Sequence, residues 1–148
     1  MNRENPSKDF QKSDWLYDGK FFEPSNDVLK TFYGFVYEIE EINTGKKYIG
    51  KKFFWRTKTL PITKTRKRRK KTLVESDWRT YYGSNLELKE RVEDGKNIYN
   101  RVILRLCRSK GECSYYEAKL QFENDVLLRD DYYNEFIGCK IHSKHVKI

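Results

Sequence analysis

The fold is decided by Tyr33-Gly34-Phe35-Val36-Tyr37-Glu38-Ile39 and, after Asn43-Thr44-Gly45, by Lys47-Tyr48-Ile49-Gly50-Lys51-Lys52. Apolar and polar residues alternate before the Asn-Thr-Gly segment, and a second short run follows it, which predicts a β-hairpin. A hairpin brings distant strand positions side by side, so Tyr37 and Tyr48 are expected on adjacent strands. Two phenols beside a lysine cluster suit chemistry on a phosphate. The alternative is ordinary sheet packing, because tyrosine is common in strands.

Positive charge is concentrated in and just after this hairpin. The chain has a net charge of +9, yet no acidic residue lies between Glu41 and Glu75, where thirteen lysines and arginines are found. The rest of the chain carries 18 basic residues against 22 acidic ones. A localised cationic strip is the electrostatic footprint of a phosphate-backbone binder; a localisation tag or a solvated loop is the alternative. The residues expected to contact nucleic acid are Lys52, Arg56, Lys64, Arg66, Lys67, Arg68, Arg69, Lys70 and Lys71.

The length of 148 residues suits one domain with one core. Residues 1–30 are polar with scattered aromatics, and we expect them to form an arm that packs on the body. No apolar run reaches membrane-spanning length, and the first residues lack the apolar stretch of a signal peptide. A cytoplasmic protein with no membrane partner is therefore expected.

The cysteines do not form a recognisable framework. Cys107, Cys113 and Cys139 are odd in number and irregular in spacing, which argues against disulfides. His142 or His145 could complete a structural zinc site, but no paired short spacing supports one. Reduced thiols in or near the core are the better interpretation. The two histidines could hold a metal on a helix, and a frayed tail is the alternative.

The remaining pattern predicts an α+β fold. Hairpin strands are expected over 32–42 and 47–54, and a third strand over 98–106, where a buried apolar run lies. The segment 56–71 is expected to be a mobile loop because its like charges repel one another. A short final strand is possible over 137–141. We therefore expect a small antiparallel three-stranded sheet, made of the hairpin plus the third strand and flanked by helices.

Capping signals predict the helices. A short helix is expected over 77–82, a second over 84–95 with a capping box at its start and Gly95 at its end, and a third over 114–125. In the third helix Glu117 follows Ser114 with capping-box spacing, so a structural role is open to it.

These features resemble the GIY-YIG nucleases, over about residues 32–134. The second signature of that family is intact as Tyr48-Ile49-Gly50. The first is degenerate, because Phe35-Val36-Tyr37 stands where Gly-Ile-Tyr would be, with Gly34 one residue earlier. The spacing of the two tyrosines and the turn between them are also those of the family. The basic insertion and the sequence after it suggest the phage-encoded branch that includes homing-type endonucleases.

The resemblance implies a small DNA endonuclease that depends on Mg²⁺ or Mn²⁺. By position, Tyr37 would be the general base on the attacking water, Tyr48 would assist it, and Lys51 would lower a tyrosine pKa. Glu117 falls where the family has its metal-binding glutamate on a helix, so it would hold one divalent ion. Asn134, after Tyr133, falls at the asparagine of the family and would orient the site or cap a turn.

The catalytic arginine of the family is less clearly matched, because a basic insertion over 56–74 intervenes. Arg79, on the helix expected over 77–82, is the first candidate, and Arg56 is the second. Arg79 can equally be a solvated charge on a helix face. The family often has a histidine one turn later, and here Tyr82 takes that place or nothing does.

The resemblance makes residues 31–148 a GIY-YIG-like nuclease domain that follows the arm over 1–30. Two other functions remain open: a binding module that kept this fold without the chemistry, and a basic RNA-binding protein. A monomer or weak dimer is expected, and pairing on DNA would allow one active site per strand. Sequence preference and the choice between nicking and double-strand cleavage do not follow from the residues.

Overall fold

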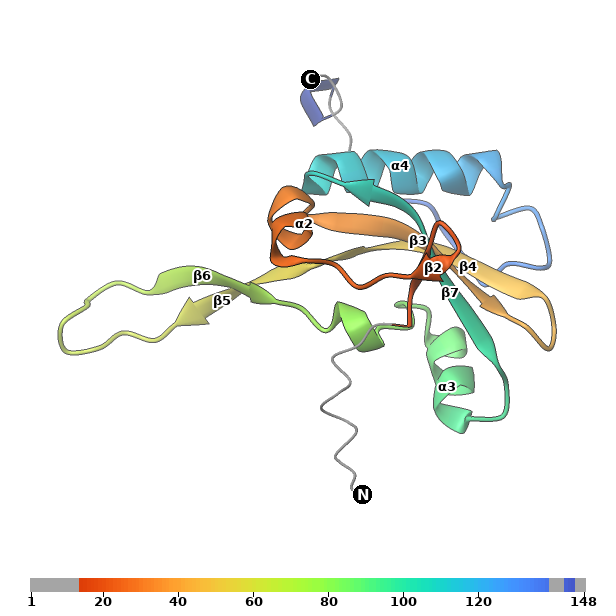
Figure 1. Cartoon of the computed structure of the whole chain (residues 1–148), viewed down its shortest axis with the longest axis horizontal. Coiled ribbons are helices and arrows are strands. Elements are labelled where there is room, and N and C mark those ends of the chain that lie inside the picture. Colours follow the sequence, from red (N-terminus) through yellow and green to blue (C-terminus); the bar gives the residue numbers. More distant parts are fainter. Residues whose placement is uncertain (1–13, 139–142, 146–148) are drawn as a thin grey trace.

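The structure is a computed structural model that describes residues 14–138 and 143–145 (Figure 1). In chain order its elements are β1 (Leu16–Tyr17), β2 (Lys20–Phe21), α2 (Asn26–Thr31), β3 (Gly34–Glu41), β4 (Lys46–Phe53), β5 (Trp55–Leu60), β6 (Lys70–Glu75), the 3₁₀ helix η1 (Trp78–Thr80), α3 (Leu86–Asp94), β7 (Tyr99–Cys107), α4 (Lys110–Glu123) and the 3₁₀ helix η2 (Ser143–His145). The described strands form a five-stranded sheet in the order β2-β1-β7-β3-β4 and a separate two-stranded sheet, β5-β6. The predicted α+β class is confirmed.

The hairpin predicted around the two tyrosines forms part of the main sheet. β3 and β4 pair antiparallel, with Tyr37 opposite Gly50 and Ile39 opposite Tyr48. Gly45 has a φ of +76° in the connecting turn, a conformation that glycine adopts without strain. β7 pairs antiparallel with the other side of β3. β4 is therefore the outer strand of the sheet, and among the described residues its outer edge pairs with no strand, only through an isolated parallel bridge from Lys47 to Tyr132.

The expected size of the sheet was wrong, because the described strands β1 and β2 add to it. β1 runs parallel to β7, with Leu16 opposite Val102, and β2 pairs antiparallel with β1. Asp18 and Gly19, with φ of 55° and 79°, turn the chain tightly between them. Strands of two residues are too short to show a period in the sequence. Their place is set instead by Trp15, which is buried and donates from Nε1 to the Trp78 carbonyl at 2.8 Å.

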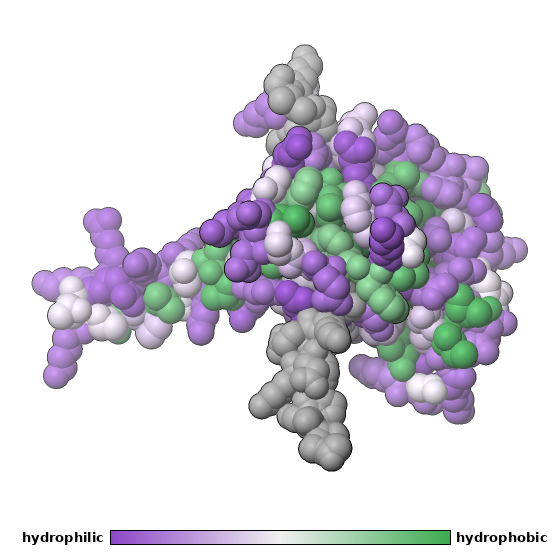
Figure 2. Space-filling model, in the orientation of Figure 1, coloured by the Kyte–Doolittle hydropathy of each residue, from purple (hydrophilic) through white to green (hydrophobic). Residues whose placement is uncertain are grey.

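The loop expected over 56–71 is confirmed for residues 61–69, but the residues on either side of it form the strands of a hairpin. β5 and β6 pair over their whole length and project from the body of the molecule (Figure 1). Like charges do not prevent the pairing because no cation lies opposite another: Lys58 faces Thr72, and Lys71 faces Thr59. The surface of this hairpin is mostly hydrophilic in Figure 2, so the strands keep their charged side chains in solvent.

The helix boundaries also differ from the prediction. Only a 3₁₀ turn, η1, forms within 77–82, and α3 is capped by the side chain of Asn85 instead of Ser84. α4 begins after Ser109, whose hydroxyl accepts from the Glu112 backbone N–H at 3.1 Å. The helix therefore starts earlier than the expected boundary at residue 114. Glu117 lies in the middle of α4 and has no capping role, so the structural role considered for it was wrong.

The core lies on both faces of the main sheet because successive strand residues point to opposite sides. Phe35 and Tyr37 belong to an aromatic cluster on one face. Val36 belongs to a second cluster on the other face, which α4 covers (Figure 1). Cys107 and Cys113 are buried free thiols in this second cluster, as predicted. Cys139, His142 and most of the strand predicted over 137–141 lie outside the described residues.

Candidate active site

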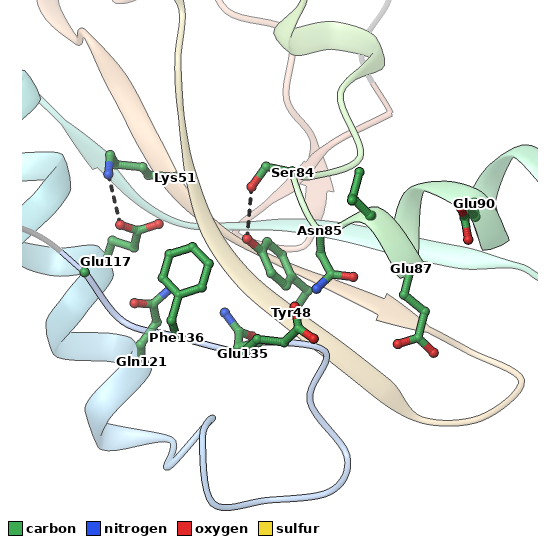
Figure 3. Close-up of a pocket in the computed structure, with 13 residues that line it drawn as sticks. Tyr48, Lys51, Ser84, Asn85, Glu87, Glu90, Glu117, Gln121, Glu135 and Phe136 are labelled. Carbon is green, nitrogen blue, oxygen red and sulfur yellow. Dashed lines mark hydrogen bonds and ion pairs between the residues drawn. The ribbon is translucent and has the colours of Figure 1, made fainter.

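A cleft of about 640 Å³ opens along the free edge of β4 (Figure 3). It lies between β4, the start of α3, the middle of α4 and the segment 134–138. Its lining residues are Tyr48, Lys51, Ser84, Asn85, Leu86, Glu87, Glu90, Glu117, Gln121, Asn134, Glu135, Phe136 and Gly138. Four residues predicted for catalysis, Tyr48, Lys51, Glu117 and Asn134, are thus brought together.

The two tyrosines lie on the same face of the hairpin, with ring centroids 6.3 Å apart. Tyr48 lines the cleft, whereas Tyr37 is only 1% exposed and packs in the aromatic core. The Tyr37 hydroxyl crosses directly over Gly50: a Cβ at that residue would lie 2.5 Å from it. Because Gly50, the glycine of the Tyr-Ile-Gly signature, has no side chain, it leaves room for the Tyr37 hydroxyl.

Two hydroxyl-bearing residues lie near the buried tyrosine and the cleft. Tyr37 packs edge-on against Tyr81, with ring centroids 6.0 Å apart. Ser84 shares a hydrogen bond of 3.2 Å with the Tyr48 hydroxyl, which is drawn as a dashed line in Figure 3. Tyr81 and Ser84 were not predicted as site residues, because only folding brings them to β4.

Burial dominates the acidity of both tyrosines. It raises the pKa of Tyr37 well above the ordinary value of 10.0, with Tyr81 and Tyr48 adding to the effect. Burial also raises the pKa of Tyr48, but the hydrogen bond with Ser84 and the charge of Lys51 oppose it, while Glu117 reinforces it. Glu117 raises the pKa of both tyrosines, but of the two only Tyr48 also has Lys51 lowering its pKa.

Lys51 and Glu117 form an ion pair across the cleft, with Nζ 3.0 Å from Oε1 (Figure 3). One turn further along α4, the Gln121 amide donates to the Ile49 carbonyl at 2.8 Å, which ties the helix to β4. The described residues contain no group of three or more acidic, histidine or cysteine side chains arranged to hold a metal. Mg²⁺ often uses one or two carboxylates together with waters and substrate phosphates, so Glu117 fits such an ion.

Asn134 covers the free edge of β4. Its Oδ1 accepts from the Ile49 backbone N–H at 3.1 Å, and its Nδ2 donates to the Ile49 carbonyl at 2.8 Å. The preceding residue, Tyr133, donates its backbone N–H to the Lys47 carbonyl at 2.7 Å. Asn134 therefore occupies backbone groups that a further strand would otherwise pair, and it holds the residue between Tyr48 and Gly50.

A buried carboxylate anchors the segment that carries Asn134. Glu41 is fully buried, and burial alone would raise its pKa. Hydrogen bonds from Arg91, Thr44, Tyr99 and Tyr133 outweigh that effect and lower the pKa to about 2. The Tyr133 hydroxyl donates to Glu41 at 3.1 Å, so the position of Asn134 depends on this charge.

A family model matches residues 15–137, and its description is "Putative endonuclease segE, GIY-YIG domain". The chain belongs to this family. No curated protein and no solved structure matches the chain significantly. The resemblance inferred from the two tyrosine signatures is thus confirmed, and it extends beyond 32–134 to include Trp15 and the β1–β2 hairpin. Membership of the GIY-YIG family indicates nuclease activity.

Neither Arg79 nor Arg56, the two candidates for the arginine of the GIY-YIG family, lines the cleft, and no other arginine of the described residues does. Arg79 pairs with Glu75 at 3.0 Å and stacks over the Trp78 ring. Arg56 borders a neighbouring hollow of about 230 Å³ that also contains Lys51. Tyr82, considered for the place of the family's histidine, packs against Tyr99 and away from the cleft lining.

The predicted nucleic-acid contacts have different surroundings in the GIY-YIG domain. Lys52 is held by Asp77 at 2.6 Å and lies over the Tyr81 ring. Arg66 turns back and donates to the Pro61 and Arg68 carbonyls at the tip of the basic hairpin. The other predicted contacts, Arg56, Lys64, Lys67, Arg68, Arg69, Lys70 and Lys71, are exposed.

Sequence analysis missed several residues of the cleft. Glu87, Glu90 and Glu135 line it, and Phe136 stands at its border with a 76% exposed ring. Gln121 carries no local signal, because its role exists only once α4 packs on β4. No helix in the described part of this domain is both long and apolar enough to cross a membrane.

Proposed function

We propose that the protein is a divalent-metal-dependent endonuclease that hydrolyses phosphodiester bonds of DNA in the cleft along β4. The observation that carries the proposal is the convergence of Tyr48, Lys51 and Glu117 in that cleft, with Asn134 bracing the strand between them. These side chains come from β4, α4 and the segment after it, and all of them line the cleft.

The charge of the cleft favours a metal-dependent reaction. Among the described residues, four glutamates and one lysine line it. A phosphodiester entering such a cleft would be repelled unless a cation accompanied it. Of these glutamates, Glu117 is the one paired with Lys51, and we propose that it holds Mg²⁺ or Mn²⁺. The ion would offset the charge that builds up on phosphorus oxygens and the leaving oxygen.

We propose Tyr48, in place of Tyr37, as the general base. A base must reach the attacking water, and Tyr48 lines the cleft whereas Tyr37 is buried. Ionisation of Tyr37 is further disfavoured because burial raises its pKa. Tyr37 would act instead as a positioning residue, because its ring packs beside those of Tyr48 and Tyr81.

Lys51 would control the ionisation of Tyr48. In the present structure Lys51 neutralises Glu117, and the two charges act in opposite directions on the Tyr48 pKa. When Glu117 is neutralised by another cation, Lys51 is left to stabilise the Tyr48 phenolate. The phenolate takes a proton from water as the water oxygen bonds to phosphorus. The bond from phosphorus to the 3′ oxygen then breaks, and that oxygen takes a proton from solvent.

We propose Arg56, ahead of Arg79, as the arginine that contacts the substrate. Arg56 is exposed and shares a hollow with Lys51. Arg79 is already paired with Glu75. A phosphate adjacent to the one being cut would meet Arg56 first.

The test is cleavage of supercoiled plasmid at millimolar Mg²⁺ by the wild type, Tyr48→Phe and Glu117→Gln. General-base catalysis contributes roughly 10² to 10⁴ in rate, so Tyr48→Phe should lose about 100-fold or more. Glu117→Gln should lose about as much, because it removes the carboxylate that would hold the metal ion and its stabilisation of charge in the transition state. Glu123→Gln is the matched control, because this glutamate lies on the same helix, is exposed and does not line the cleft. Cleavage at the wild-type rate by all the variants would overturn the assignment of the active site to this cleft.

Tyr37→Phe separates the two tyrosines. We expect it to keep activity within about tenfold of the wild type, because a base in the cleft remains. A folded Tyr37→Phe protein that is as inactive as Tyr48→Phe would restore Tyr37 as the base. A wild type that binds DNA but cuts none would support the binding module, and stronger competition by structured RNA than by duplex DNA would support an RNA-binding protein.

A further inference from the structure

The β5–β6 hairpin has two chemically different faces. In an antiparallel pair, residues directly opposite each other point to the same side. The register places Arg56 with Val74, Lys58 with Thr72 and Leu60 with Lys70. These residues form one face, which we call the basic face: Arg56, Lys58, Leu60, Lys70, Thr72 and Val74.

The opposite face has no net charge. It consists of Trp55, Thr57, Thr59, Lys71, Leu73 and Glu75. It carries one cation, Lys71, and one anion, Glu75, which is also paired with Arg79, whereas the basic face carries no acid. Sequence order conceals this difference, because Lys70 and Lys71 are neighbours in the chain yet belong to different faces.

The basic face continues from the candidate active site. At its base, Arg56 borders a hollow with Lys51 and Lys52, and Lys51 also lines the catalytic cleft. The opposite face begins at a separate hollow, where Leu73 lies with Phe32 and Tyr33. Trp55 borders both hollows. A track of positive side chains therefore leads from Lys51 through Arg56 and Lys58 to Lys70.

The dimensions of the hairpin match one groove of B-form DNA. Two paired strands are about 4.8 Å apart, and their side chains widen the ribbon to about the 12 Å of the major groove. The minor groove, about 6 Å wide, does not admit such a ribbon. The six residues of β5 span roughly 20 Å, or about six base pairs at 3.4 Å each. The hairpin projects from the body, so it can enter a groove without obstruction (Figure 1).

We propose that the β5–β6 hairpin lies in the major groove of the duplex that is being cut, on one side of the scissile phosphate, with its basic face toward the DNA. The proposal rests on the proposed function, because it takes the cleft as the place of cleavage. Lys58 and Lys70 bind the phosphates that flank the groove, and Arg56 bridges the hairpin to the cleft. The hairpin thereby fixes the distance between the contacted base pairs and the cut.

The sharpest test compares Lys70→Gln with Lys71→Gln, which remove the same charge from opposite faces of one strand. Binding to a duplex is measured in EDTA as a function of salt, so no cleavage is needed. We expect Lys70→Gln to make the negative slope of log K against log salt less steep by about 0.9, and the double variant Lys58→Gln/Lys70→Gln to do so by about twice that. Lys71→Gln should change the slope by less than half as much as Lys70→Gln. Lys96→Gln, in the connection after α3, is the charge-matched control.

Methylation interference identifies the groove. Methylation of guanine N7, in the major groove, should weaken binding over about six base pairs on one side of the cleavage site. Interference at adenine N3 alone, in the minor groove, would overturn the proposal, as would equal losses for Lys70→Gln and Lys71→Gln. A Tyr48→Phe protein that no longer cuts but retains this pattern supports the hairpin proposal independently of the catalytic one. A wild type that cuts DNA without any groove interference refutes the hairpin proposal alone.

Discussion

Gly50→Ala tests whether the glycine of the second signature exists to make room for the first tyrosine. Its Cβ would lie 2.5 Å from the Tyr37 hydroxyl, 2.8 Å from Tyr37 Cζ and 2.9 Å from Tyr48 Cε2. Gly50 is not among the residues with positive φ, so the effect is steric and not a matter of backbone strain. Tyr37 is buried on all sides and cannot swing away, so both rings must shift.

The expected cost follows from this overpacking. Extra methyl groups in a packed core typically cost about 1–3 kcal/mol. For a domain of this size, each kcal/mol lowers Tm by about 2–4 °C, so Tm should fall by roughly 2–12 °C, as measured by thermal unfolding. Displacing Tyr48 by even 1 Å can cost about 100-fold in rate, so plasmid cleavage should fall even where the protein remains folded.

Two further variants make the test specific. In a Tyr37→Phe background the shortest contact is absent, so Gly50→Ala should cost about 1 kcal/mol less than in the wild type. Gly138→Ala is the control for Tm, because its Cβ would meet nothing nearer than a Phe136 carbon at 3.8 Å. A Gly50→Ala protein with the Tm and cleavage rate of the wild type would refute the reasoning.

Three further predictions concern charge and edge contacts. Because the folded pKa of Glu41 is lowered to about 2 from 4.5, its stabilising effect is present above about pH 4.5 and is lost as pH falls toward 2. Glu41→Gln should therefore lower the free energy of unfolding at pH 7 by about 3–5 kcal/mol, as measured by urea unfolding. The variant should also lose less stability than the wild type between about pH 4.5 and 2, and profiles that run parallel for the two proteins would contradict this. Because burial raises the pKa of Tyr48 above 10.0 and Lys51 opposes it, cleavage should increase with pH across the neutral range, and Lys51→Ala should move the rise to higher pH; an unshifted pH–rate profile would argue against Tyr48 as the base. Asn134→Ala removes both side-chain hydrogen bonds to Ile49. It should lower the free energy of unfolding by about 1–3 kcal/mol and should also lower kcat. An unchanged kcat in the folded variant would show that Asn134 contributes to stability and not to catalysis.

Local signals were sufficient for the central hairpin. The alternation on either side of Asn43-Thr44-Gly45 depends on neighbours in the chain, and it correctly placed Tyr37 and Tyr48 on paired strands. The same kind of signal misplaced α4, because Ser109 and Ser114 are each followed three residues later by a glutamate. Either can start a helix, and packing of the longer helix on the sheet decides between them.

The basic segment shows a different limit. Its composition predicted a loop over 56–71, which holds for 61–69 but not for the flanking strands, because strand pairing depends on which residues face each other. Opposite every cation in β5 and β6 stands an uncharged residue, a fact that charge counting over a window does not contain.

The amino-acid sequence by itself determined the family, the paired tyrosines and the concentration of positive charge, since each is a local pattern or a sum over the chain. The tertiary structure alone decided which tyrosine reaches the cleft, which face of the basic hairpin is cationic, and that Asn134 covers the edge of β4. The reason is physical: burial, register and edge pairing arise between residues distant in the chain. Tyr37 and Tyr48 look alike in the sequence, and only the packing around Gly50 makes one a buried support and the other a candidate base.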